Sequence, residues 1–131
     1  MLSFGKCMAV VTLLFVTSTI QAADPIGIWI TEKSETGSSM AVEIFDCNGR
    51  LCGKAVDVFD APNRDSVGIE IIKGMRKKSE TTYKRGKIYG PDTKQWYKSK
   101  MILQSDDKLK VSGCVLGGVI CRSQVWTRQK K

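Results

Sequence analysis

The sequence has no histidine, only three prolines and no stripe of apolar residues at helical spacing. Without histidine the chain cannot form a Ser–His or Cys–His catalytic pair, a His-ligated zinc site or an imidazole pH switch. It also has no glycine-rich loop that would cradle phosphates and no metal-ligand cluster. A length of 131 residues with 42% hydrophobic and 26% charged residues favours one globular domain over disorder or a membrane bundle.

The first 22 residues have the pattern of a secretory signal peptide. Lys6 precedes the apolar run Met8–Val16, and Gln21-Ala22-Ala23 supplies small residues for cleavage after Ala22 or Ala23. The apolar run is shorter than the roughly 20 residues of a membrane span, which argues against an uncleaved anchor. We therefore expect a periplasmic or secreted protein whose single domain covers residues 23–131.

Removal of the signal peptide takes Cys7 with it and leaves four of the five cysteines. An even number of cysteines in a small exported domain points to disulfides. Two turns suggest the pairing, because Gly117-Gly118 sets Cys114 opposite Cys121 and Asn48-Gly49 brings the cysteines on either side of it together. The gaps between the cysteines do not fit a redox or zinc motif. We predict two hairpin disulfides, Cys47–Cys52 and Cys114–Cys121.

The mature chain alternates apolar and polar residues almost throughout, which indicates strands. Exposed edges would be a liability for so many sequential strands, so a closed up-and-down barrel is favoured over a sandwich. The expected fold is all-β, an eight-stranded antiparallel barrel. The predicted strands are 26–32, 40–47, 51–58, 69–74, 83–89, 96–103, 108–115 and 119–127.

The register of the last hairpin predicts which side chains face the lumen. Leu109 and Val111 alternate with lysines and should point inward, and the pairing of Cys114 with Cys121 then turns alternate residues of the last strand inward as well. An apolar lumen with a few polar groups is typical of a small-ligand pocket. The candidate ligand contacts are Trp29, Tyr97, Met101, Arg122, Gln124 and Trp126.

Arg122 is the most informative of these candidates, and two interpretations of it stay open. A buried guanidinium can hold a carboxylate or phosphate group in a bidentate manner while the apolar lumen takes the rest of a ligand. Alternatively, Arg122 closes the barrel by stacking on a tryptophan and bonding to backbone carbonyls, with nothing bound.

The segment Gly27-Ile28-Trp29, with an arginine near the last strand, looks like the signature with which lipocalins close the base of their barrel. Together with the Cys47–Gly53 hairpin and the stretch from Cys121 to Arg128, it resembles the small exported bacterial proteins grouped as domain-of-unknown-function family 2147. The resemblance covers the whole mature chain and implies a lipocalin-like barrel without agreed catalytic residues. It also implies that Gly27 and Trp29 close the barrel with Arg128 or, alternatively, Arg122.

Lysine and arginine outnumber acidic residues by 21 to 13, and many lie on one predicted hairpin. Such a hairpin can meet an anionic envelope surface, such as lipid head groups or polysaccharide, or can simply be a solvated face that keeps the protein soluble. Export makes nucleic acid an unsuitable partner. The residues of this basic hairpin are Arg76, Lys77, Lys78, Lys84, Arg85 and Lys87.

These observations leave three hypotheses for the function. The favoured one is a non-catalytic binding module that holds an apolar or amphipathic, anionic small molecule in its lumen. The alternative is a closed barrel that acts through its basic outer surface as an envelope adaptor, inhibitor or host-directed factor, and contact among Met101, Trp126 and Tyr97 in a filled lumen would favour it. An enzyme is disfavoured because no two carboxylates are forced together inside, and no cofactor or metal is expected.

Overall fold

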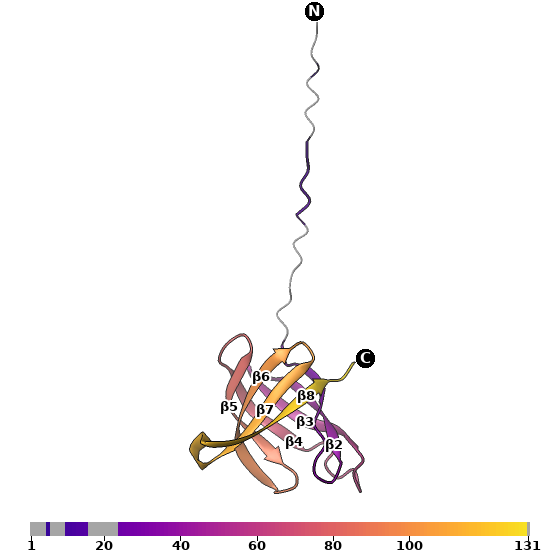
Figure 1. The fold of residues 1–131 in the computed structure, drawn as a ribbon, viewed down its shortest axis with the longest axis vertical. Helices are drawn as coiled ribbons and strands as arrows, with labels where there is room; N and C mark the ends of the chain where they lie inside the picture. The colour runs from indigo at the N-terminus through magenta and orange to yellow at the C-terminus, as the bar shows by residue number, and fades with distance from the viewer. Residues whose placement is uncertain (1–4, 6–9, 16–23, 131) are drawn as a thin grey trace, which may run out of the picture.

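The computed structural model describes residues 5, 10–15 and 24–130 (Figure 1). The predicted cleavage positions and Cys7 lie outside the described residues. Eight strands follow one another along the chain: β1 (Gly27–Ile30), β2 (Ser39–Cys47), β3 (Arg50–Phe59), β4 (Glu70–Lys77), β5 (Thr82–Gly90), β6 (Gln95–Ser105), β7 (Lys108–Val115) and β8 (Ile120–Arg128). Among the described residues, no helix has the length and apolar character needed to cross a membrane.

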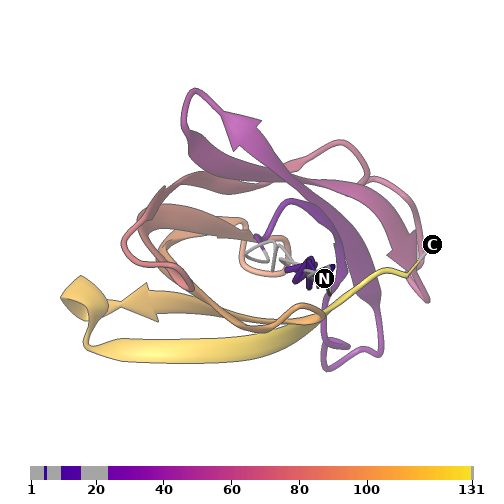
Figure 2. The same cartoon turned by 90° about the horizontal axis from the view of Figure 1, so that it is seen from above.

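Each strand pairs antiparallel with the next, and β8 returns to β1, so the sheet closes into a barrel (Figure 2). The predicted all-β, eight-stranded up-and-down barrel is therefore confirmed. Because neighbouring strands alternate in direction, the N-terminal segment, the C-terminus and the β6–β7 turn share one end, which we call the base. The opposite end, called the mouth, carries the β1–β2, β3–β4, β5–β6 and β7–β8 connections.

The core fills the barrel with inward-facing apolar side chains. Period-two alternation produces this core, since Leu109 on β7 and its partner Trp126 on β8 both point inward. The side chains that show essentially no exposed surface are Trp29, Val42, Ala55, Ile72, Met75, Met101 and Leu109. Burial of each large side chain contributes about 1.5–3 kcal/mol to the free energy of unfolding.

Arg128 closes the base over Trp29. Its guanidinium lies 4.4 Å from the Trp29 ring and donates hydrogen bonds to the backbone carbonyls of Asp24, Ile26 and Asp106, at 2.7, 2.8 and 2.6 Å. Gly27 has a φ of 140°, and a Cβ at this position would lie 2.8 Å from an Arg128 nitrogen. Only glycine therefore lets the guanidinium reach the Ile26 carbonyl. Of the two arginines considered for this role, the structure places Arg128 there.

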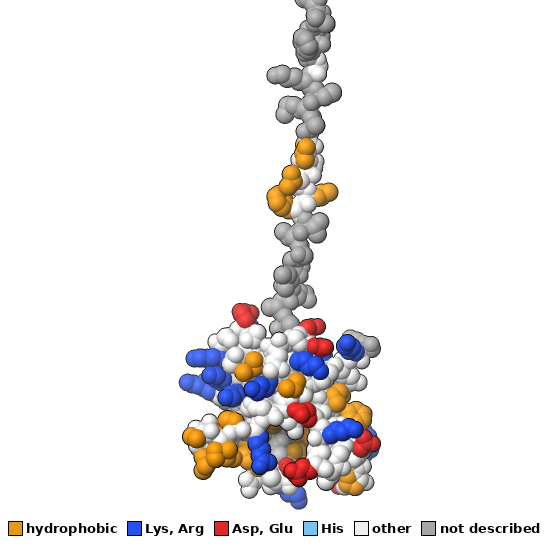
Figure 3. Space-filling model, viewed as in Figure 1, with side chains coloured by type: hydrophobic (Ala, Val, Ile, Leu, Met, Phe, Trp, Pro, Cys, Tyr) orange, Lys and Arg blue, Asp and Glu red, His pale blue; other side chains and the backbone are white. Residues whose placement is uncertain are grey.

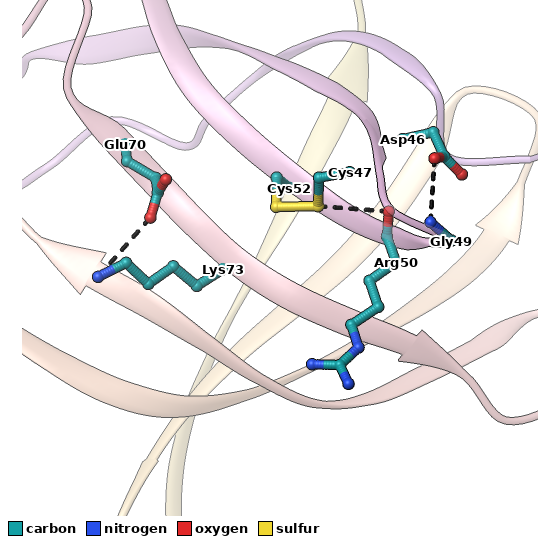
Figure 4. Close-up of a disulfide and its surroundings, with 7 residues drawn as sticks. All are labelled: Asp46, Cys47, Gly49, Arg50, Cys52, Glu70 and Lys73. Carbon is teal, nitrogen blue, oxygen red and sulfur yellow. Dashed lines mark hydrogen bonds and ion pairs between the residues drawn. A yellow bond between two sulfur atoms is a disulfide. The ribbon is translucent and has the colours of Figure 1, made fainter.

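Both predicted disulfides are present, Cys47–Cys52 across the β2–β3 turn, which Figure 4 shows, and Cys114–Cys121 across the β7–β8 hairpin. In the β2–β3 turn, Asp46 accepts a hydrogen bond from the Gly49 N–H. The β7–β8 connection is longer than the two-residue turn predicted, because the last paired residues are Val115 and Ile120 and a 3-10 turn, η1 (Leu116–Gly118), follows Val115. The register of the cysteines is as predicted.

The β7–β8 hairpin extends beyond the closed part of the barrel (Figure 1). β1 ends at Ile30, earlier than the predicted Glu32, and pairs with β8 at only two positions, Trp29 with Arg128 and Ile30 with Thr127. The part of β8 before Thr127 therefore pairs with β7 along one edge and has no neighbouring strand along its other edge. Glu32 instead accepts a hydrogen bond from the Val125 N–H at 2.6 Å.

The predicted burial of Arg122 and Gln124 in the lumen is wrong, since both side chains are exposed. Their register is as expected, with Arg122 opposite Gly113 and Gln124 opposite Val111. A position on the inward face is buried only where a neighbouring strand covers it, and β1 is too short to cover this part of β8. The space beside Gly113 is taken by Ile88 and Tyr97.

Loss of the base closure should destabilise the protein. Arg128→Ala removes three charge-assisted hydrogen bonds and the contact with Trp29, so we expect a loss of at least about 2 kcal/mol in the free energy of unfolding. Arg128→Lys should also lower the free energy of unfolding, because an ammonium group cannot reproduce the planar guanidinium that donates to three carbonyls at once. Urea denaturation measures both effects. The matched control is Arg122→Ala, expected to change stability by less than about 0.5 kcal/mol, and equal losses at both positions would contradict this role for Arg128.

Reduction of the disulfides should lower the melting temperature without abolishing the fold. The bridges join cysteines only five and seven residues apart, so each should contribute about 2 kcal/mol, at the low end of the usual range. Thermal denaturation followed by circular dichroism, with and without reductant, tests this expectation. A reduced protein without a cooperative transition would show that the barrel core is too weak to fold alone.

Candidate functional site

The interior offers little room for a ligand at the level of the core. A water-filled lumen would leave its lining side chains accessible, but Trp29 and Met101 are 0% exposed and Trp126 is 2% exposed. Met101 and Trp126 belong to one packed cluster with Trp29, whereas Tyr97 lies half-buried nearer the mouth and donates a hydrogen bond to the Thr93 hydroxyl. The candidate lumen residues are thus divided between a closed core, the edge of the mouth and an exposed hairpin.

Polar groups inside the barrel are satisfied by the protein itself. Ser99 donates to the Ser112 carbonyl at 2.8 Å, and the Trp126 indole donates to Gln124 at 2.9 Å. Within the described ranges, no buried side-chain nitrogen or oxygen lacks a hydrogen-bond partner. No unpaired polar atom therefore points to a missing ligand in this part of the chain.

The acidic side chains organise turns and do not converge. Asp24 and Asp92 accept hydrogen bonds from backbone N–H groups one or two residues further along. Arg64, whose guanidinium lies 2.8 Å from Asp57, lowers the pKa of that carboxyl with help from the Val58 N–H. Burial raises the pKa of Tyr83, a core residue. Across residues 24–130, no three His, Cys, Asp or Glu side chains cluster as a metal site would require.

Positive charge is concentrated on the outer side of β4, β5 and β6 (Figure 3). Lys73 on β4 is paired with Lys87 on β5, and Lys87 is paired with Lys98 on β6, so three lysines form a row across three strands. A second row begins with the pair Arg76 and Lys84 and continues toward Lys100 on β6. We call these six exposed residues the cationic face: Lys73, Arg76, Lys84, Lys87, Lys98 and Lys100.

The fold itself gains nothing from this arrangement. Like charges directly opposite one another on neighbouring strands are destabilising. Two acids lie close by, with Glu70 3.7 Å from Lys73 and Glu80 3.8 Å from Lys77 (Figure 4 shows the first pair). Both pairs are solvent-exposed, and such pairs contribute little.

The basic hairpin predicted from the sequence forms the base-side end of the cationic face. Arg76, Lys77, Lys78, Lys84 and Arg85 line a surface groove of about 380 Å³ around the β4–β5 turn. Lys73, Lys98 and Lys100 belong to the same surface but were not predicted as members of it. Their outward alternation was visible in the sequence, but the cross-strand alignment that unites them was not.

The chain matches the family model described as an uncharacterized protein conserved in bacteria (DUF2147) over residues 27–128. It belongs to this family. Among solved structures, this DUF2147 protein is similar to HP1028 from Helicobacter pylori, described as belonging to the lipocalin family, with a TM-score of 0.70 and 20% sequence identity over 82% of this chain and 84% of that one. No curated protein matches the chain. The lipocalin-like fold agrees with the predicted resemblance.

Proposed function

We propose that this DUF2147 protein is a non-catalytic, exported binding module that uses its outer surface, and that the cationic face binds anionic molecules of the cell envelope. The observation that carries the proposal is the combination of a closed core with aligned rows of exposed cations. The signal-peptide pattern of the first 22 residues supports export to a compartment where anionic glycans and lipids are the abundant partners. This function corresponds to the alternative hypothesis of the sequence analysis.

The spacing of the cations suits a partner with repeated negative charges. Neighbouring strands lie about 4.8 Å apart, so Lys73, Lys87 and Lys98 present three charges over roughly 10 Å. Successive charged groups of a phosphorylated or sulfated polymer can meet such a row. Lys73 is further held by Trp96, whose ring lies 4.0 Å from the ammonium group. A cation already positioned in the free protein loses less conformational entropy on binding.

The lumenal hypothesis has less support. It depended on a buried guanidinium, but Arg122 lies on the exposed hairpin and Arg128 is engaged with three backbone carbonyls. Met101 and Trp126 occupy the space that an apolar ligand would need. A small molecule at the mouth, near Tyr97, is therefore an outcome to be checked by experiment and is not the main proposal.

Binding to dextran sulfate, with neutral dextran as the reference, tests the proposed function. We expect dextran sulfate to bind with an affinity that falls as salt is raised, because exposed charges are screened within about 8 Å at 0.15 M ionic strength. The double variant Lys87→Glu/Lys98→Glu should bind at least about tenfold more weakly, as reversing two charges removes two attractions and adds two repulsions. Isothermal titration calorimetry measures the dissociation constants.

The matched control is Lys33→Glu/Lys130→Glu, which changes the net charge equally at exposed positions outside the cationic face. It should retain nearly the wild-type affinity. Equal losses in both double variants would mean that net charge alone determines binding and would overturn the proposal. Native mass spectrometry of protein from its own host adds a second check, since a retained small molecule lost on Tyr97→Ala would support a site at the mouth of the barrel instead.

A further inference from the structure

The tip of the β7–β8 hairpin exposes a cluster of aliphatic side chains. Val115 is 42% exposed, Leu116 71%, Val119 83% and Ile120 52%, and together these four residues are here called the apolar tip. In Figure 3 hydrophobic side chains gather at the lower left, where the tip of the β7–β8 hairpin lies in Figure 1, and Lys and Arg side chains gather above them. A folded protein in water gains no hydrophobic stabilisation from side chains held this far out.

The apolar tip also requires an unfavourable backbone conformation. Leu116 has a φ of 52°, in the left-handed region where glycine and asparagine are favoured. The residues that usually form such turns are glycine, asparagine and aspartate, and here only Gly117 and Gly118 are of that kind. The Cys114–Cys121 disulfide joins the two strands directly behind the tip. The hairpin is therefore held in place with its apolar residues outward.

The apolar tip adjoins the cationic face through the strand pairing. Lys98, the last lysine of the row, is the partner of Cys114 on β7, and Val115 follows directly. The charge row therefore ends one residue before the apolar tip along β7, although Val115 points to the opposite face of the hairpin from Lys98. Aliphatic side chains next to clustered lysines are the combination with which peripheral proteins bind an anionic bilayer, because the aliphatic groups enter the interfacial region while the cations meet the head groups.

We propose that this surface docks on an anionic phospholipid bilayer, with the apolar tip entering the lipid interface and the cationic face lying on the head groups. The inference rests on the proposed function, since it names the anionic partner that the cationic face contacts. It goes further in assigning a role to Leu116 and Val119, which a purely electrostatic interaction with a soluble polymer would not use.

A second copy of the chain fits the same surface less well. Strand addition would use the open edge of β8, but the Val125 N–H on that edge is already bonded to Glu32. Association of two apolar tips would also bring together the lysine rows of both copies, with Arg122 exposed nearby. Charge complementarity therefore selects the anionic bilayer.

Co-sedimentation with lipid vesicles tests the inference. We expect the mature chain, residues 23–131, to bind vesicles of phosphatidylcholine mixed with phosphatidylglycerol at least tenfold more strongly than vesicles of phosphatidylcholine alone. The variant Leu116→Asn/Val119→Ser should partition to the mixed vesicles about tenfold or more weakly, because it lacks several aliphatic CH₂ equivalents that the wild type would bury in the lipid interface. Asparagine tolerates a positive φ, so this variant should fold at least as well as the wild type. Its affinity for dextran sulfate should be unchanged.

The control variant is Val67→Ser, which removes an exposed aliphatic side chain from the β3–β4 loop and should bind vesicles like the wild type. As a direct readout, Val119→Trp should show a blue-shifted fluorescence component with the mixed vesicles, and Val67→Trp should not. Two results would overturn this inference and leave the proposed function standing. One is binding of dextran sulfate without binding of vesicles, and the other is vesicle binding that Leu116→Asn/Val119→Ser does not weaken. Failure to bind either probe would overturn both. If the wild type dimerises in a concentration-dependent manner and Leu116→Asn/Val119→Ser does not, the occupant of this surface is a second copy of the chain instead.

Discussion

The contact between Arg128 and Trp29 compensates for the weakest joint of the barrel. β1 is four residues long and meets β8 at two residue pairs, so backbone pairing alone holds the first and last strands together poorly. The guanidinium adds hydrogen bonds to the segment before β1, through Asp24 and Ile26, and to the β6–β7 turn, through Asp106. One side chain thus joins three parts of the chain that are far apart in sequence. The ring of Trp29 beneath it is fully buried and anchors this joint to the core.

Closure at the base explains why the two ends of the molecule differ. Near the base, every strand has neighbours on both sides, and the interior fills with side chains such as Met75 and Met101. Toward the mouth, β1 has ended, so β7 and β8 continue as a hairpin with one open edge. The Cys114–Cys121 disulfide and the bond from Val125 to Glu32 hold this hairpin where sheet neighbours cannot. The length of β1 therefore decides which inward positions become core and which become surface.

The sequence predicts the pattern of pairing well because that pattern is local. Alternation and turn glycines determine the register within a hairpin, which is why Cys114 lies opposite Cys121 and Gly113 opposite Arg122 as expected. Burial depends on a more distant strand. Nothing near Arg122 reveals that β1 stops at Ile30, so its exposure could not be predicted, and the choice between Arg122 and Arg128 for the base stayed open for the same reason.

The cationic face could not be predicted from the sequence for a similar reason, because it depends on how distant strands pair. Lysines on β4, β5 and β6 become neighbours only through three separate strand registers, and a bulge between Tyr83 and Gly86 shifts one of them. A random outward scatter of lysines would serve solubility equally well without placing Lys87 between Lys73 and Lys98. Because that alignment opposes folding, the fold does not account for it, whereas the proposed anionic partner would account for it by neutralising the row. The closed barrel provides a rigid sheet, so these charges are already aligned in the free protein.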